Sequence, residues 1–231
     1  MEAGLSNNIA CIIQARISSS RLPGKIALDL HGKTILERVI EQCINVQDNI
    51  DLIIATSTDS SDNITAEIGK SAGVDVYRGS LLDVRSRYLN AGKGYKYIIR
   101  ATADNPFTEP TFIEESIEKI NNNNCDYISI SNCPYGTGVQ TFKYELLEYC
   151  RNTYDDQENR EHVLIEHQLL QDTNIITQQI PASPWSYPNM YLSVDVIKDY
   201  LRAFKIFASL KNNNLSNTLH NVVPIYKNLF L

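Results

Sequence analysis

Short apolar segments alternate with amphipathic segments from residue 9 to about residue 131, and this alternation constrains the fold more than any other feature. The continuous apolar runs of strand length are 9–14, 51–57, 74–79, 95–101 and 126–131. The intervening segments with a helical period are 33–46, 61–73, 81–93 and 109–122. Continuous apolar strands that alternate with helices are typical of a mostly parallel sheet covered by helices on both faces. The sequence therefore predicts an α/β fold.

Local signals support these boundaries. Thr34 and Glu37 have the spacing of a capping box at the start of the first helix, and Gly73 follows the second helix as a C-terminal glycine. Beyond residue 131 the pattern loosens. We expect helices near 143–152, 158–171 and 196–208, and strands near 174–180 and 190–194. No linker or internal repeat interrupts the chain, so we expect one domain over residues 1–231.

Composition excludes several classes of protein. The net charge is −6, whereas a general nucleic-acid binder is more often basic. No apolar run approaches the roughly 20 residues of a membrane helix, and the first residues do not resemble a signal peptide. The five cysteines are odd in number and form no CxxC motif, which argues against a disulfide framework or a zinc site. We expect a reduced, cytoplasmic protein with no membrane or nucleic-acid partner.

The segment ARISSSRLPGK (15–25), which follows the first predicted strand, carries three cations and three serines but no acid. Guanidinium and ammonium groups suit phosphate oxygens, and the turn residues Pro23 and Gly24 favour a run of exposed backbone amides. In open parallel sheets, ligands bind beyond the carboxyl ends of the strands. The position of this segment favours a phosphate site, although a solvated basic loop has the same composition.

Two carboxylates also follow apolar strands. Asp104 comes after the fourth predicted strand, and Asp195 comes after the apolar segment YLSV. A carboxylate beside a polyphosphate requires a cation between them, and Mg²⁺ is commonly held by one or two carboxylates together with substrate phosphates. Taken singly, each of these residues is better explained as a helix or turn cap.

Five stretches, in order and over nearly the whole chain, resemble the cytidylyltransferase superfamily that includes CMP-3-deoxy-manno-octulosonate synthetases and CMP-sialic acid synthetases. The most specific is IIQARISSSRLPGKIALDLHGKTILERVI (12–40), because the usual form in the family is Q-A-R-[MLI]-G-S-[ST]-R-L-P-G-K. The others are VYRGSLLDVRSRY (76–88), IIRATADNPFTEP (98–110), REHV (160–163) and LSVD (192–195). The resemblance is closest to the branch of the spore coat polysaccharide biosynthesis protein SpsF.

This resemblance implies a Rossmann-like three-layer sandwich of the nucleotide-diphospho-sugar transferase type. It also implies transfer of CMP from CTP to an acidic sugar or related anionic small molecule, with release of pyrophosphate. The nucleotide would bind in the core at 9–131, and the region 132–195 would hold the acceptor and a homodimer contact.

Site residues follow from the same resemblance. The implied catalytic residues are Arg16, Lys25 and Asp104. The implied nucleotide contacts are Ala15, Arg16, Ser18, Ser19, Arg21, Lys25, Arg78, Arg100 and Thr102. The cofactor would be Mg²⁺ on Asp104 and Asp195. The implied acceptor contacts are Tyr135, Gln140, Glu161 and His162.

The chain departs from the family pattern in two places. Ser18 stands where the family usually has glycine, and its Cβ could crowd a phosphate or restrict a left-handed backbone. Gly138 and Gln140 stand where relatives often have carboxylates, in the pattern G-L-D-V-E-x-F. The loss of two negative charges near the acceptor suggests a different and more anionic acceptor, such as a phosphonate or a phosphorylated metabolite.

Three classes of function remain open. The first is a Mg²⁺-dependent cytidylyltransferase, and the second is a nucleotidyltransferase that uses another base, because a phosphate loop does not read the base. The third is a non-catalytic nucleotide-binding protein with a degenerate site. Binding of different nucleotides with and without Mg²⁺ separates these classes.

Overall fold

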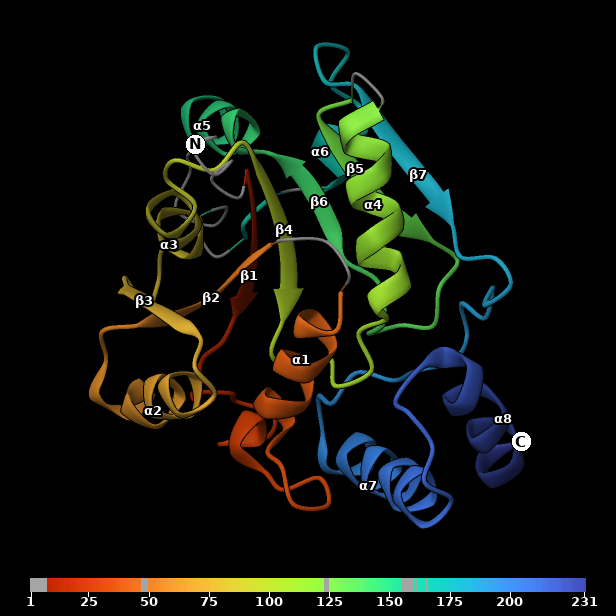
Figure 1. Ribbon diagram of the computed structural model, residues 1–231. Coiled ribbons are helices and arrows are strands. Elements are labelled where there is room, and N and C mark those ends of the chain that lie inside the picture. Colours follow the sequence, from red (N-terminus) through yellow and green to blue (C-terminus); the bar gives the residue numbers. More distant parts are fainter. Residues whose placement is uncertain (1–7, 47–49, 123–124, 155–159, 161, 165) are drawn as a thin grey trace, which may run out of the picture.

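The computed structural model describes residues 8–231 except 47–49, 123–124, 155–159, 161 and 165. Its centre is a seven-stranded sheet with the strand order β3-β2-β1-β4-β6-β5-β7 (Figure 1). The strands are β1 (Ile9–Gln14), β2 (Asp51–Ser57), β3 (Asp75–Gly79), β4 (Tyr97–Thr102), β5 (Tyr127–Ser131), β6 (Gln140–Lys143) and β7 (Thr177–Pro181). This confirms the predicted α/β class and the five strands expected before residue 131.

One strand runs against its neighbours. β6 pairs antiparallel with both β4 and β5, whereas the other pairings in the sheet are parallel. β6 has four residues and begins and ends with the polar residues Gln140 and Lys143, so it lacks the apolar run by which the other strands were predicted. Its register places Gln140 opposite Arg100 of β4 and opposite Ser129 of β5.

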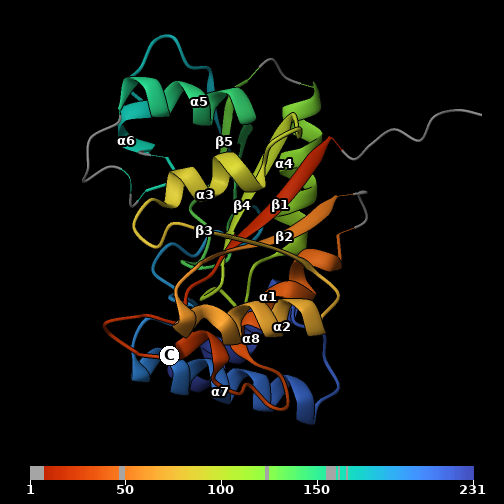
Figure 2. The same cartoon turned by 90° about the vertical axis from the view of Figure 1, so that its left-hand side faces the viewer.

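Helices cover both faces of the sheet, as the three-layer prediction requires (Figure 2). One buried cluster joins the sheet to α1 (Ile35–Ile44), α2 (Asn63–Ser71) and α4 (Pro110–Asn122). A second cluster, on the opposite face, joins it to α3 (Val84–Ala91), α5 (Tyr144–Thr153) and α6 (Glu166–Leu169). Ala10 and Ile12 of β1 belong to different clusters from Cys11 and Ile13, because successive side chains of a strand point to opposite faces.

The predicted helix 158–171 is only partly helical. Within the described residues of this stretch the helix is α6, Glu166–Leu169. Val163 is buried without being helical, and its carbonyl accepts a hydrogen bond of 3.2 Å from the buried Arg85 of α3. Arg85 also donates to the carbonyl of Cys150 at the end of α5. The Val163 carbonyl thus takes its hydrogen bond from a guanidinium of another element, whereas a continuous helix would satisfy this carbonyl internally.

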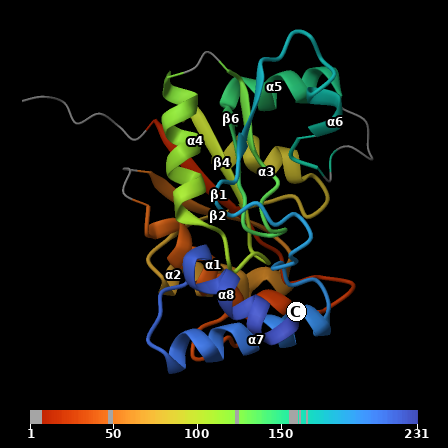
Figure 3. The same ribbon diagram turned by 90° about the vertical axis from the view of Figure 1, so that its right-hand side faces the viewer.

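The C-terminal part forms a separate layer beyond the carboxyl ends of the parallel strands (Figures 1 and 3). α7 (Ile197–Asn212) and α8 (Leu219–Phe230) pack there around a third cluster that includes Phe107 and Phe207, with ring centroids 5.0 Å apart. α8 was not predicted, and Pro224 lies within it. The predicted strand at 190–194 is wrong: this segment makes one isolated bridge, from Tyr191 to Tyr135, because its partner is a loop rather than a strand.

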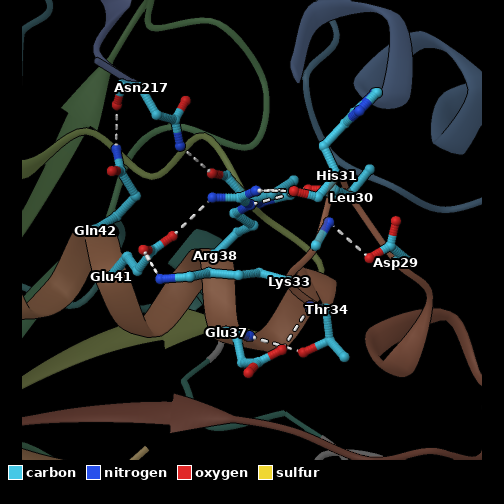
Figure 4. A network of polar contacts seen from close by, with 12 residues as sticks. Asp29, Leu30, His31, Lys33, Thr34, Glu37, Arg38, Glu41, Gln42 and Asn217 are labelled. Atoms are coloured by element: carbon cyan, nitrogen blue, oxygen red, sulfur yellow. Dashed lines mark hydrogen bonds and ion pairs between the residues drawn. The ribbon is translucent and has the colours of Figure 1, made fainter. Parts of the chain in front are cut away.

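Polar side chains of α1 join it to the segment before it, to the segment after β4 and to the C-terminal layer (Figure 4). The predicted capping box is confirmed, since Thr34 and Glu37 each accept the other's backbone N–H. Arg38 donates to the carbonyl of Leu30 at 2.6 Å, and Gln42 donates to the carbonyls of Thr108 and Asn217. The elements that carry the two predicted site loops are therefore fixed to each other by buried polar contacts.

The five cysteines are unpaired, as predicted, and Cys133 is the one that is not fully buried. Within the described residues, no helix is both long and apolar enough to cross a membrane.

Candidate active site

A cavity of about 700 Å³ opens at the carboxyl ends of β1 and β4 and continues onto the sheet face covered by α3, α5 and α6. The segment 15–25 and the segment 102–106, which the sequence places after these two strands, meet there. Ten of the predicted site residues line it: Arg16, Ser19, Arg21, Lys25, Arg100, Thr102, Asp104, Tyr135, Gln140 and Asp195. The carboxyl ends of adjacent parallel strands share one edge of the sheet. Lys25 and Asp104, which are 79 positions apart in the sequence, therefore come into contact.

Lys25 is the centre of this contact. Its Nζ lies 2.6 Å from Asp104 Oδ2 and 3.0 Å from Asp195 Oδ1, and the residue is only 7% exposed. Lys25 begins a short 3₁₀ turn, η1 (Lys25–Ala27), directly after Gly24, whose φ of 73° is the left-handed conformation that glycine adopts without strain. The Pro-Gly turn thus brings a charged side chain from the loop into the site.

Asp195 is held on several sides. Arg21 Nη2 donates to its Oδ1 at 2.6 Å, the hydroxyl of Tyr191 donates to its Oδ2 at 2.5 Å, and its backbone N–H donates to Asp199. Burial alone would raise the pKa of this carboxyl. The Tyr191 hydroxyl and the neighbouring cations Lys25 and Arg21 outweigh burial and lower the pKa below its ordinary value. Asp195 is therefore ionised at neutral pH.

The segment 15–25 is anchored by a residue that sequence reasoning missed. Asp62, at the end of η2 (Ser60–Asp62), is fully buried, and its carboxylate accepts the backbone N–H of Ile17 at 2.6 Å. The hydroxyls of Ser57 and Thr65 also donate to Asp62. Nothing in the local sequence distinguishes this aspartate from a helix cap, because its partner is 45 residues away.

Asp104 and Asp195 fit a divalent cation. Both carboxylates converge on one point, where they share the Lys25 ammonium, and carboxylate oxygens are the ligands that Mg²⁺ prefers. No group of three or more His, Cys, Asp or Glu side chains within the described part of the chain is arranged to hold a metal. Two carboxylates suit a cation whose remaining ligands are substrate phosphates and water.

The cavity has two chemically different ends. We call the group Arg16, Arg21, Lys25, Asp104 and Asp195 the loop end. The sheet end consists of Gln14, Arg100, Ser129, Gln140 and Glu166, of which only Arg100 and Gln140 were predicted. Arg100 Nη1 donates to Gln140 Oε1 at 2.8 Å, and its Nη2 is 3.3 Å from Gln14 Oε1. Gln14, Ser129 and Glu166 were missed because each is a single polar position on a separate element.

Several predicted site residues lie outside the cavity lining. Ala15 is buried and its backbone N–H donates to Ala55, while Ser18 and His162 are exposed. Arg78, on the edge strand β3, directs its guanidinium to Asn63 and to the carbonyls of Ser57 and Asp59. Contacts of these residues with a ligand stay predictions. Glu161 lies outside the described residues.

Ser18 does not have the strained backbone that its comparison with glycine suggested. Positive φ values at non-glycine residues of the described chain occur at His31, Asn132 and Asn214. Ser18 therefore adopts a conformation open to any residue, and its exposed side chain leaves the lining of the cavity unchanged.

The loop between β5 and β6 closes one side of the cavity through close backbone contacts. Gly136 has a φ of 90°, and a Cβ there would lie 2.5 Å from the backbone nitrogen of Ser193. Tyr135 and Tyr191 stack beside it with ring centroids 4.7 Å apart. At Gly138 a Cβ would lie 3.0 Å from Cys133 Sγ, so the thiol occupies the space where relatives often have a carboxylate side chain.

A comparison with known protein families decides the assignment. The model of the family described as Cytidylyltransferase matches residues 10–219. The chain belongs to the cytidylyltransferase family. This cytidylyltransferase is 34% identical over 206 residues to an uncharacterized protein of Methanocaldococcus jannaschii, which covers 87% of this chain and 82% of that protein. It is 30% identical over 203 residues to the spore coat polysaccharide biosynthesis protein SpsF of Bacillus subtilis, with 84% of each chain covered.

Further relatives include a 3-deoxy-manno-octulosonate cytidylyltransferase of Parabacteroides distasonis, 32% identical over 105 residues, which are 45% of this chain and 41% of that protein. Among solved structures, a cytidylyltransferase from Leptospira borgpetersenii superposes on this cytidylyltransferase with a TM-score of 0.84 and 26% identity. The match covers 96% of this chain and 95% of that chain. A CMP-2-keto-3-deoxy-manno-octonic acid synthetase complexed with CTP has the same fold, with a TM-score of 0.68 and 16% identity over 91% of this chain and 100% of that chain.

Proposed function

We propose that this cytidylyltransferase transfers CMP from CTP to an acidic sugar or a related anionic small molecule and releases pyrophosphate. The observation that carries the proposal is the contact of Lys25 with both Asp104 and Asp195, at 2.6 Å and 3.0 Å, beside Arg16 and Arg21. Cations for a polyphosphate and paired carboxylates for a divalent cation stand together in one cavity. Relatives named for 3-deoxy-manno-octulosonate support an acidic acceptor.

Mg²⁺ is the cofactor that we propose for the two carboxylates. Asp104 and Asp195 would hold the ion, which would neutralise phosphate charge during transfer. In the structure, the Lys25 ammonium and the Arg21 guanidinium compensate the same carboxylates. Binding of a metal–triphosphate complex therefore frees both cations to pair with phosphate oxygens, which makes metal and nucleotide binding mutually dependent.

The proposed reaction requires little acid–base catalysis. The acceptor oxygen forms a new bond to the α-phosphorus as the bond to pyrophosphate breaks, and the acceptor hydroxyl loses its proton to solvent water. Arg16, Arg21 and Lys25 would stabilise the charge that develops on the leaving pyrophosphate. Preorganised cations of this kind act where charge appears, and Lys25 is preorganised because it is almost fully buried.

Calorimetric binding of CTP, UTP, ATP and GTP, each with and without Mg²⁺, tests the proposal. Selective binding of CTP that is strengthened by Mg²⁺ is the expected result. Binding of another base would move the assignment to another nucleotidyltransferase, and binding that ignores Mg²⁺ would contradict the role of the carboxylates. Asp104→Ala should remove the effect of Mg²⁺, whereas Asp75→Asn, an exposed aspartate on β3, is the matched control.

A further inference from the structure

A chain of polar side chains crosses four neighbouring strands at the sheet end of the cavity. Gln14, Arg100 and Gln140 form its first part. Gln140 Nε2 then donates to the hydroxyl of Tyr127 at 2.8 Å, and that hydroxyl donates to Glu166 Oε1 at 2.9 Å. The chain therefore ends at a carboxylate on α6, which lines the cavity opposite the phosphate loop.

Among the residues that the structure describes, Glu166 is engaged through Oε1, which accepts from the Tyr127 hydroxyl. Burial, together with the negative charge of Glu166, raises the pKa of Tyr127, so the tyrosine stays protonated and acts as the donor to Oε1. Glu166 Oε2 has no partner among the residues that the structure describes, and no described cation lies within ion-pair distance of this carboxylate. An ionised carboxylate only accepts hydrogen bonds, so Oε2 offers the cavity an acceptor.

A second group at the sheet end also lacks a partner. Ser129 is 7% exposed, lines the cavity, and its hydroxyl makes no hydrogen bond of ordinary geometry with the described residues. The Ser129 hydroxyl oxygen is itself buried in the wall of the cavity, and a buried polar group without a partner is costly. Ser129 and Glu166 both line the sheet end of the cavity, and of the two the Glu166 carboxylate carries the charge.

We propose that Glu166 is a specificity-determining residue that selects an acceptor with a hydroxyl group at the end remote from the transferred nucleotide. This inference rests on the proposed function and names its substrate class: a polyhydroxylated acid with one anionic end. Oε2 of the carboxylate accepts a hydrogen bond from that hydroxyl group. By like-charge repulsion, the carboxylate disfavours an acceptor that carries a second anionic group at the same end.

This conclusion reverses the expectation of a more anionic acceptor. Gly138 and Gln140 do lack the carboxylates that relatives often have, but Glu166 brings a carboxylate to the same pocket from another element. Gln140 contacts Glu166 through one intervening hydroxyl, that of Tyr127. The negative charge is therefore displaced within the acceptor pocket rather than lost.

The test compares wild type with Glu166→Gln on two matched probe acceptors, 3-deoxy-manno-octulosonate and its 8-phosphate, which differ only at the remote end. Pyrophosphate release with CTP and Mg²⁺ gives kcat/KM for each probe. Wild type should prefer the unphosphorylated probe by about 10- to 100-fold, the worth of a hydrogen bond to a charged group. Glu166→Gln should lower that ratio about tenfold, and it should raise kcat/KM for the phosphorylated probe, which a folding defect cannot do.

Glu67→Gln, an exposed glutamate on α2, is the matched control and should leave the ratio unchanged. An unchanged ratio in Glu166→Gln, or a wild type that prefers the phosphate, would overturn the inference. If CTP binds with Mg²⁺ dependence but releases no pyrophosphate in the presence of either probe, the inference is also overturned, while the proposed binding of CTP and Mg²⁺ would stand. A wild type that does not bind CTP by calorimetry would refute the proposed function itself, and the inference with it.

Discussion

The two ends of the cavity are built in opposite ways. At the loop end, three cations come from one stretch of eleven residues, and two carboxylates each follow a strand or extended segment. At the sheet end, Gln14, Arg100, Ser129 and Gln140 come from four different strands, and α6 contributes Glu166. The loop end is dominated by paired charges, and the sheet end by uncharged hydrogen-bonding groups around one cation and one anion.

On the proposed function, this difference corresponds to a difference in chemical task, because the loop end would hold the triphosphate and the sheet end would hold the acceptor. A triphosphate is the same in every nucleotide, so its site can be encoded as one contiguous loop. An acceptor has a particular shape, and its site must place single groups at separate points. Positions on different strands can change one at a time without altering the phosphate loop, which allows specificity to vary while the transfer chemistry is kept.

The largest effect should come from Lys25→Met at the loop end. The variant removes the cation shared by Asp104 and Asp195 and leaves two carboxylates facing each other. Pyrophosphate release with CTP and 3-deoxy-manno-octulosonate should fall by about 10²- to 10³-fold. Lys70→Met, an exposed lysine at the end of α2, is the control. Turnover within a few fold of wild type would mean that the loop end works without its central cation.

A slightly smaller effect, on stability, is expected at Gly136 in the loop that closes one side of the cavity. Gly136→Ala would place a Cβ 2.5 Å from the Ser193 nitrogen in a left-handed backbone, so the free energy of unfolding should fall by roughly 2–4 kcal/mol. Gly138→Ala should cost less, because its closest contact is the Cys133 thiol at 3.0 Å and its backbone is not left-handed. Denaturant unfolding measures both, and an equal cost would contradict the close backbone contact at Gly136.

Acid titration of stability probes the paired carboxylates. A carboxyl whose pKa is lower in the folded protein adds stability above its ordinary pKa, and the addition disappears as the pH falls through the lowered value. For Asp195 the loss should occur below about pH 3.8, the ordinary value. Asp195→Asn should therefore show a shallower decline of unfolding free energy below that pH than wild type. Parallel curves for the two proteins would show that Lys25, Arg21 and Tyr191 do not stabilise the charged form.

Ser18→Gly should have the smallest effect. The serine is exposed, lies outside the cavity lining and needs no left-handed backbone. CTP affinity measured by calorimetry should change by no more than about twofold, as is usual for surface positions. A gain of tenfold or more would show that the family's glycine matters at the loop end after all.

Much of the fold was predictable because the local signals agree. The five strands before residue 131 are apolar runs of the right length, and Thr34 with Glu37 marks the start of α1 correctly. The errors lie where tertiary contacts replace local signals. β6 is too short and too polar to be predicted from its sequence, and Arg85 donates to the Val163 carbonyl within the predicted helix 158–171.

The sequence by itself determined the alternation of strands and helices in the parallel core, the cationic loop after β1 and the carboxylate after β4, because each depends on neighbours along the chain. Only the tertiary structure decided that Lys25 stands between Asp104 and Asp195, that Asp62 anchors the loop, and that Glu166 reaches the sheet end of the cavity. These contacts join residues 170, 45 and 39 positions apart, respectively for Lys25 with Asp195, Ile17 with Asp62, and Tyr127 with Glu166. Separations of that size leave no periodic or local trace, since they are fixed by strand order and by which face of the sheet each side chain occupies.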